Sequence, residues 1–540
     1  MFSTGLALSS LTLLFTTCAV AQSNTTSNAA ACSAFTLKNV NNTIVTNKTF
    51  YNAGDNVTIS NLYNGISTTQ LPAFCRIELA ITTNATANST ALTEVWLPAQ
   101  WNNRLIAFGN GGLAGGANLA NLGSIAMVQG FAGMSTNTGH QSGPNDGRWG
   151  GPHNDNAIID FSWRALHLSV IVSKEVVQQY YGRAQKKSYY LGCSTGGRQG
   201  MKEVQELPDD FDGAVVGSAA NWMSHLTAMI THTVISTRFN TTRFIPADTW
   251  TNLIHPEVLE QCDELDGLKD GIINDPRRCS FRPETLICKP NQDASTCLSF
   301  DQIDTIHKLY TDYYDVNQTY IFGGWYPGSE SGMSQYLVNS DPAPLGPQAY
   351  KYIIANDTNW DYDDFNFAAI VEAEQVLVGM EALSTNLTAF NARNGKVIHY
   401  VGLSENLISA ANTLHYYEGL NAWNLANAGP KTDDFYRLFT VPGMEHCNSS
   451  LGGFGPIAFG GDNQAAAGMP PAKLDAQHDV LSALVNWVEG GVAPEQLIGT
   501  GYVNNSVANG IQLQRPLCKY PAMSRYKSGD PNEASSFVCE

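Results

Sequence analysis

A serine in a tight glycine turn is the residue of this sequence best suited to do chemistry. Residues 192–197 read Gly-Cys-Ser-Thr-Gly-Gly, which places Ser194 at the centre of a G-x-S-x-G pattern. An apolar run precedes this turn and a segment that can start a helix follows it, as in a nucleophile elbow, where the serine hydroxyl is exposed. The pattern also fits a plain glycine-rich turn, so the assignment depends on finding a base and an acid.

An activated serine needs a histidine base, and the histidine needs an acid that orients it. In α/β-hydrolases the acid and then the histidine follow the serine along the chain. Two later apolar runs end in loops that carry Glu405 and His446, respectively. We therefore predict Glu405 as the acid and His446 as the base. Asp433 and Asp434 are less favoured alternatives for the acid, and Glu405 also fits a solvated loop position.

Cysteines stand next to both of the predicted catalytic residues. Cys193 directly precedes Ser194, and Cys447 directly follows His446. A disulfide holds its two Cα atoms about 5.5–6 Å apart. A bridge between these cysteines would therefore bring the serine and the histidine within hydrogen-bonding reach.

A glycine-rich loop at 109–116 follows the apolar run 104–108. Such a loop lets a ligand approach the backbone closely. An oxyanion hole combines the N–H of the residue after the serine with an N–H from an earlier loop. We predict that Thr195 and either Gly111 or Gly112 supply these groups, while each glycine alone also fits an ordinary turn.

The segments around these residues alternate between strand and helix patterns. Short alternating runs from about 30 to 100 predict antiparallel strands. Later buried strands are predicted at 104–108, 130–136, 188–191, 211–217, 396–401 and 436–441, and helices at 156–181, 410–421 and 479–489. This order predicts an α/β fold with an α/β-hydrolase core, a mostly parallel sheet covered by helices on both faces.

Between about 222 and 390 the pattern changes to scattered helices, turn-rich stretches and many aromatic residues. We interpret this segment as a large lid inserted into the core. The predicted organisation is a signal peptide at 1–21, a catalytic domain formed by 22–221 and 391–540, and a lid at 222–390.

Composition limits the partners of the chain. Its 540 residues are 43% hydrophobic and 14% charged, which indicates a globular protein. The formal net charge of −18 argues against binding to nucleic acid or to an anionic membrane. A neutral or polymer-attached substrate fits better.

Three features predict export. An apolar run from Leu6 ends in Ala19-Val20-Ala21, which fits a signal peptide with an A-x-A cleavage site. Twelve N-x-S/T sequons predict a glycosylated surface. Ten cysteines remain after Cys18 is removed with the signal, an even number typical of disulfides in an oxidising compartment.

Together these residues resemble the secreted tannase and feruloyl esterase family, whose mark is a Cys-Ser, acid, His-Cys constellation. The similarity covers nearly the whole mature chain and includes 192–200, 211–221, 325–328, 402–408 and 441–447. It implies that Ser194 is the nucleophile, that His446 is the general base and that Cys193–Cys447 is a disulfide. The family usually has Asp at the position of Glu405.

An acidic loop at 262–275 suits a hard cation with oxygen ligands, although a solvated acidic turn fits the chemistry equally well. The resemblance implies a structural Ca²⁺ site there, with side-chain ligands Asp263, Asp266 and Asp270 and carbonyl ligands Leu268 and Ile272. It also implies the disulfides Cys32–Cys75, Cys262–Cys279, Cys288–Cys297 and Cys518–Cys539.

The resemblance further implies a secreted serine carboxylic ester hydrolase without an organic cofactor. Its expected substrates are feruloyl or related hydroxycinnamoyl esters of plant cell-wall polysaccharide, with galloyl esters, as in a tannase, as the alternative. Trp325 and Tyr326 could flank the substrate ring, but a place in the lid core is the favoured interpretation. A non-catalytic, hydrolase-like binding protein is the alternative class, and the presence of both Ser194 and His446 argues against it.

Overall fold

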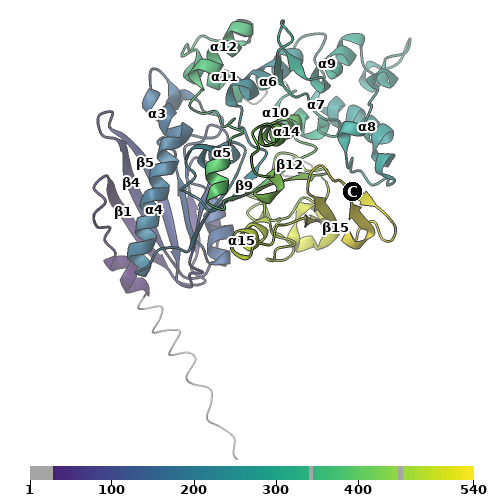
Figure 1. The fold of residues 1–540 in the computed structure, drawn as a ribbon. Coiled ribbons are helices and arrows are strands. Elements are labelled where there is room, and N and C mark those ends of the chain that lie inside the picture. The colour runs from purple at the N-terminus through teal and green to yellow at the C-terminus, as the bar shows by residue number, and fades with distance from the viewer. Residues whose placement is uncertain (1–27, 340–343, 448–453) are drawn as a thin grey trace, which may run out of the picture.

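The computed structural model describes residues 28–339, 344–447 and 454–540 (Figure 1). The predicted signal peptide and the sequons at Asn24 and Asn448 lie outside these ranges. Within them, no helix combines the length and the apolar character needed to cross a membrane.

A single nine-stranded sheet forms the centre of the molecule, in the order β1-β4-β5-β7-β6-β8-β9-β12-β13. All neighbours from β7 to β13 are parallel, and β1, β4, β5 and β7 pair antiparallel. The strand bounds are β1 Thr43–Tyr51, β4 Phe74–Asn84, β5 Ser89–Pro98, β6 Arg104–Phe108, β7 Ala132–Thr136, β8 Lys187–Cys193, β9 Gly213–Gly217, β12 Lys396–Gly402 and β13 Tyr436–Val441.

Burial follows the type of pairing. Every residue of β9 and β13 is buried, as expected for parallel strands that are covered on both faces. In the antiparallel β4, buried and half-buried side chains alternate over much of the strand, because one face of this part of the sheet is less covered. The continuous apolar runs in the sequence therefore mark the parallel half of the sheet.

Helices cover both faces of the sheet. One face packs against α4 (Ala165–Tyr181), α5 (Thr195–Glu206) and α14 (Ala410–Ala426). The other packs against α15 (Val480–Gly490) and the helical segment 119–127. The helix predicted at 156–181 begins one residue earlier, as α3 (Asp155–Ile159), and continues through a π-helical stretch into α4.

A layer of helices between β9 and β12 lies above the sheet in Figure 1 and has an apolar core of its own, which includes Trp250, Trp325 and Tyr350. Its elements are α6 Met223–Ser236, α7 Ala247–Thr249, α8 His255–Cys262, α9 Phe300–Tyr310, α10 Glu330–Tyr336, α11 Leu345–Ala349, α12 Phe367–Val376 and the hairpin β10 Tyr313–Tyr314 and β11 Tyr320–Phe322. The last helix before β12, α13 Thr388–Ala392, packs instead beside α5 on the sheet. The predicted α/β-hydrolase class with a large insertion is confirmed, and the domain boundaries stay a prediction.

Short antiparallel pairs complete the fold. Near the N-terminus β2 (Val57–Ser60) pairs with β3 (Gly65–Thr68). Near the C-terminus β14 (Gln496–Tyr502) pairs with β15 (Ile511–Cys518), and β16 (Ser524–Tyr526) pairs with β17 (Phe537–Cys539). The C-terminal pairs lie below the helical layer in Figure 1, in yellow.

Candidate active site

Ser194 lies on a sharp turn between β8 and α5. Its backbone angles are φ 62° and ψ −124°, a region that non-glycine residues rarely occupy. Such a strained conformation persists only where the surrounding structure fixes it. The Ser194 N–H donates to Gly217 O at 3.0 Å. A Cβ on Gly197 would lie 2.6 Å from the same oxygen, so glycine is required for this close approach. The predicted elbow is present, with the serine between strand and helix.

Glu405 and His446 lie in contact, as the sequence predicts. His446 Nδ1 is 2.7 Å from Glu405 Oε1, and the same oxygen accepts hydrogen bonds from the N–H groups of Leu407 and Ile408, each at 3.1 Å. The Glu405 side chain has no exposed surface. A carboxylate held in this way fixes the imidazole with Nδ1–H toward Glu405 and leaves Nε2 as an acceptor.

The alternative acids lie elsewhere. Asp433 accepts hydrogen bonds from Lys519 Nζ at 2.7 Å and from Tyr417 OH at 3.2 Å. It precedes β13, whereas His446 follows the end of that strand, so the length of the strand separates the two residues.

The Cys193–Cys447 disulfide joins the elbow to the histidine loop, with 6.4 Å between the two Cα atoms. His446 Nε2 lies 4.0 Å from Cys193 Sγ. Cys193 directly precedes Ser194, so the imidazole lies beside the elbow. The other four expected bridges are also formed: Cys32–Cys75, Cys262–Cys279, Cys288–Cys297 and Cys518–Cys539.

The glycine loop at 109–116 reaches the elbow. Thr195 Oγ1 donates to Gly112 O at 2.7 Å, which places the residue after the serine against the predicted oxyanion loop. Gly112 has φ +56°, and a Cβ there would lie 2.4 Å from Pro144 O. At Gly111 a Cβ would lie 2.9 Å from the Tyr63 hydroxyl. The loop is therefore held close to Ser194 by contacts that only glycine allows.

An apolar pocket opens beside Ser194. Apart from Ser194 and Thr195, the only polar side chain that lines it among the described residues is Thr227, whose hydroxyl donates to Met223 O at 2.8 Å within α6. The apolar part of the wall consists of Gly112, Leu113, Ala220, Met223, Leu226, Ile230, Leu345, Leu407 and Ile408. Of these residues, the sequence predicts only Gly112 as part of the site. The one available signal was the apolar character of 223–236 directly after a core strand, and it does not say which side chains face the serine.

The aromatic pair considered for ring binding lies elsewhere. Trp325 is buried and its Nε1–H donates to Thr233 Oγ1 at 3.2 Å. Tyr326 is partly buried and packs against the core on the sheet face that α4, α5 and α14 cover. Neither side chain lines the pocket beside Ser194, which agrees with the favoured interpretation of a structural role.

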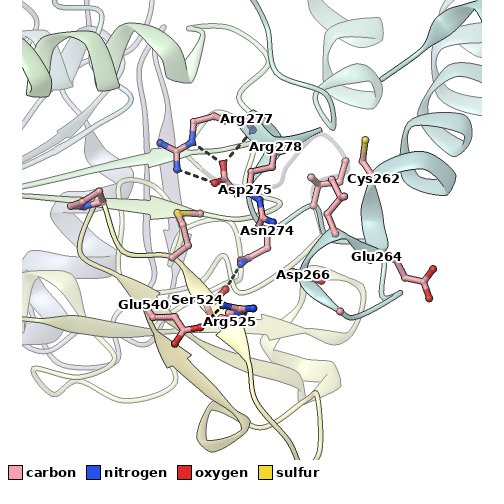
Figure 2. A pocket seen from close by; sticks show the side chains of 15 residues that line it. Cys262, Glu264, Asp266, Asn274, Asp275, Arg277, Arg278, Ser524, Arg525 and Glu540 are labelled. Atoms are coloured by element: carbon pink, nitrogen blue, oxygen red, sulfur yellow. Dashed lines mark hydrogen bonds and ion pairs between the residues drawn. The ribbon is translucent and has the colours of Figure 1, made fainter. Parts of the chain in front are cut away.

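The acidic loop at 262–275 lies away from Ser194, on the wall of a hollow that it shares with the C-terminal strands (Figure 2). Asp263 Oδ1 is buried without a hydrogen-bond partner among the described residues. Burial raises the pKa of Asp266 to about 6, and the charges of Asp270 and Asp263 act in the same direction. Arg515 pairs with Asp270. An orphaned carboxylate oxygen among hard oxygen donors fits a calcium ion, with one of the three aspartates already partly neutralised.

The comparisons with known proteins agree with this geometry. The family model described as "Tannase and feruloyl esterase" matches residues 75–540. The chain belongs to the tannase and feruloyl esterase family. A relative named "Probable feruloyl esterase B-2", from Aspergillus flavus, is 36% identical over 83% of this chain and 83% of its own length.

Solved structures of the family have the same fold. Feruloyl esterase B from Aspergillus oryzae has a TM-score of 0.86 and 34% identity, covering 95% of this chain and 100% of that one. An esterase from Aspergillus oryzae has a TM-score of 0.88 and 32% identity over the same shares. As a member of the tannase and feruloyl esterase family, the protein is a carboxylic ester hydrolase.

Proposed function

We propose that Ser194, His446 and Glu405 form the catalytic triad of an esterase that cleaves hydroxycinnamoyl esters, feruloyl esters among them. The observation that carries this proposal is the elbow cross-linked to a histidine whose Nδ1 is held by a buried carboxylate at 2.7 Å. This is the arrangement that a serine nucleophile requires.

Each residue has one task in the proposed mechanism. His446 Nε2 takes the proton of the Ser194 hydroxyl as its oxygen attacks the ester carbonyl, and Glu405 stabilises the imidazolium that forms. The N–H groups of Thr195 and of Gly111 or Gly112 receive the oxyanion. His446 then gives its proton to the leaving alcohol, and water attacks the acyl-enzyme with His446 again as base.

The pocket favours a feruloyl over a galloyl acyl group. Within the part of the chain that the structure describes, its single extra hydroxyl, on Thr227, is already bonded to the backbone of its own helix. A galloyl ring carries three hydroxyls, and each one buried without a partner costs about 1–3 kcal/mol. A feruloyl ring has one hydroxyl and one methoxy group. The names of relatives, "Probable feruloyl esterase B-2" and "feruloyl esterase B", support the same choice.

We also propose that the enzyme is exported and that it carries a structural calcium ion. Export is supported by the A-x-A site Ala19-Val20-Ala21, which ends the apolar run from Leu6, and by five disulfides. The sequons support glycosylation. Asp263, Asp266 and Asp270, with the carbonyls of Leu268 and Ile272, would hold the ion and neutralise its charge, and the ion would have a structural role. For an exported esterase of this kind, we propose that the substrate is the ester-linked polysaccharide of plant cell walls.

Release of ferulate and gallate from their methyl esters tests the proposal. We expect the parent enzyme to cleave methyl ferulate with the higher kcat/KM and Ser194→Ala to lose at least about 10³-fold in kcat. Ser482→Ala is the matched control, because this serine lies in the first turn of α15, where its hydroxyl donates to the N-cap residue Asp479. A parent that cleaves neither ester would leave the non-catalytic binding protein as the better account, and an active Ser194→Ala equal to the parent would contradict Ser194 as the nucleophile.

A further inference from the structure

A buried carboxylate outside the triad lies where the loops of the site meet. Asp462 belongs to the chain between β13 and α15 and is 4% exposed. Its Oδ1 accepts hydrogen bonds from Nδ2 of Asn118, at 3.4 Å, and of Asn121. These asparagines follow the glycine loop. The backbone of Cys193, at the elbow, also donates to this carboxylate.

The neighbours of Asp462 extend this connection to the rest of the site. Asn118 Nδ2 also donates to Gly109 O at 3.2 Å, at the start of the glycine loop. Gln464 Nε2 donates to Cys447 O at 3.0 Å, next to His446. The Asp462 N–H donates to the Tyr400 hydroxyl at 3.0 Å, on the strand that leads to Glu405. The segment 459–464 thus contacts the elbow, the residue next to His446, the asparagines that follow the glycine loop, and the strand that leads to Glu405.

The Asp462 carboxylate interacts electrostatically with His446. The hydrogen-bond donors to its carboxylate are neutral amides, including Asn463 Nδ2 at 3.1 Å. Burial raises the pKa of Asp462 to about 7, against the lowering effect of its amide donors and of the His446 charge. The carboxylate also acts on Tyr63, Tyr190 and Tyr400. Burial, together with the charge of Asp462, raises the pKa of each of these tyrosines well above the neutral range. Among the groups that interact electrostatically with Asp462, His446 is the one proposed to act in catalysis.

We propose that Asp462 is a positioning residue of the esterase: its carboxylate holds the glycine loop against the elbow, and its negative charge stabilises the His446 imidazolium during attack. The inference rests on the proposed function. Because a nearby negative charge favours a protonated imidazole, ionised Asp462 makes His446 the stronger base. A shift of one pKa unit in the base corresponds to about tenfold in its protonation equilibrium.

The pH dependence of kcat/KM on methyl ferulate tests this role. In Asp462→Asn we expect the acid limb of the profile to move to lower pH, because the imidazole loses a neighbouring charge, and the plateau kcat to fall about tenfold. KM should stay within about twofold, since the acyl pocket does not include Asp462. Asp479→Asn is the matched control: burial raises the pKa of Asp479 to about 6, and it caps α15 through Ser482, so its midpoint should stay in place.

A second variant moves the same limb in the opposite direction and leaves the carboxylate in place. Asn463→Ala removes one hydrogen-bond donor to the Asp462 carboxylate, which raises the pKa of this aspartate. The coupled pair Asp462 and His446 then loses its last proton at higher pH, and the acid limb moves up. A downward shift in Asp462→Asn with an upward shift in Asn463→Ala supports the inference. Unchanged midpoints in an active enzyme, or in Asn463→Ala alone if Asp462→Asn does not fold, overturn it. A parent enzyme that cleaves no ester overturns the proposed function instead.

Discussion

Replacement of Glu405 by Gln removes one charge from the proposed triad and changes little else. Glu405 Oε1 accepts two backbone N–H groups and faces His446 Nδ1, while Oε2 is buried without a hydrogen-bond partner among the described residues. An amide NH₂ in the place of Oε1 would face the N–H groups of Leu407 and Ile408. The amide oxygen should therefore take that place, and the imidazole keeps its tautomer.

The expected loss follows from the missing charge. With 2.7 Å between His446 Nδ1 and Glu405 Oε1, the centres of the carboxylate and the imidazolium lie about 4 Å apart, where two unit charges interact by about 4 kcal/mol at an effective dielectric of about 20. At about 1.4 kcal/mol per tenfold in rate, kcat should fall about a thousandfold. KM should change little, because the substrate pocket is intact.

Steady-state hydrolysis of methyl ferulate measures this loss, with circular dichroism to show that the variant is folded. Asp433→Asn is the matched control, since Asp433 pairs with Lys519 and Tyr417 at the opposite end of β13 from His446; it should retain kcat. If folded Glu405→Gln keeps kcat within tenfold of the parent, Glu405 is not the triad acid. If Asp433→Asn instead loses about a thousandfold, Asp433 takes that role.

Three further outcomes are expected. The double variant Cys193→Ser, Cys447→Ser opens a bridge between residues 254 apart and should lower the free energy of unfolding by about 3–5 kcal/mol in urea, with a lower kcat at temperatures where it is folded; unchanged stability would contradict this. Gly112→Ala places a Cβ 2.4 Å from Pro144 O at φ +56° and should lower kcat more than it raises KM. Chelation with EDTA should lower Tm by several degrees and added Ca²⁺ should restore it, as for a ligand that binds the folded state; a Tm that does not respond would argue against the ion at Asp266.

The sequence predicts those parts of the site that adjoin a distinctive neighbour. Ser194 and His446 stand out because each is next to a cysteine in the sequence. A disulfide holds its two Cα atoms at a fixed distance, so a bridge between these cysteines places the two catalytic residues close together in space. Strand direction separates Glu405, after a strand end, from Asp433, before a strand start. The pocket is different, because the face of α6 that meets the serine depends on how the helical layer packs on the sheet, and Leu345 enters from more than a hundred residues away. Asp462 escaped notice since Gly-Gly-Asp-Asn reads as an ordinary turn.

The cross-link between Cys193 and Cys447 has a consequence for how such an enzyme can diversify. It brackets the whole insertion between β9 and β12, which supplies Met223, Leu226, Ile230 and Leu345 to the acyl pocket. Substitutions, insertions or deletions in that segment can reshape the pocket while the covalent bond keeps serine and histidine at a constant separation. Substrate choice and bond cleavage are thereby encoded in parts of the gene that selection can alter independently.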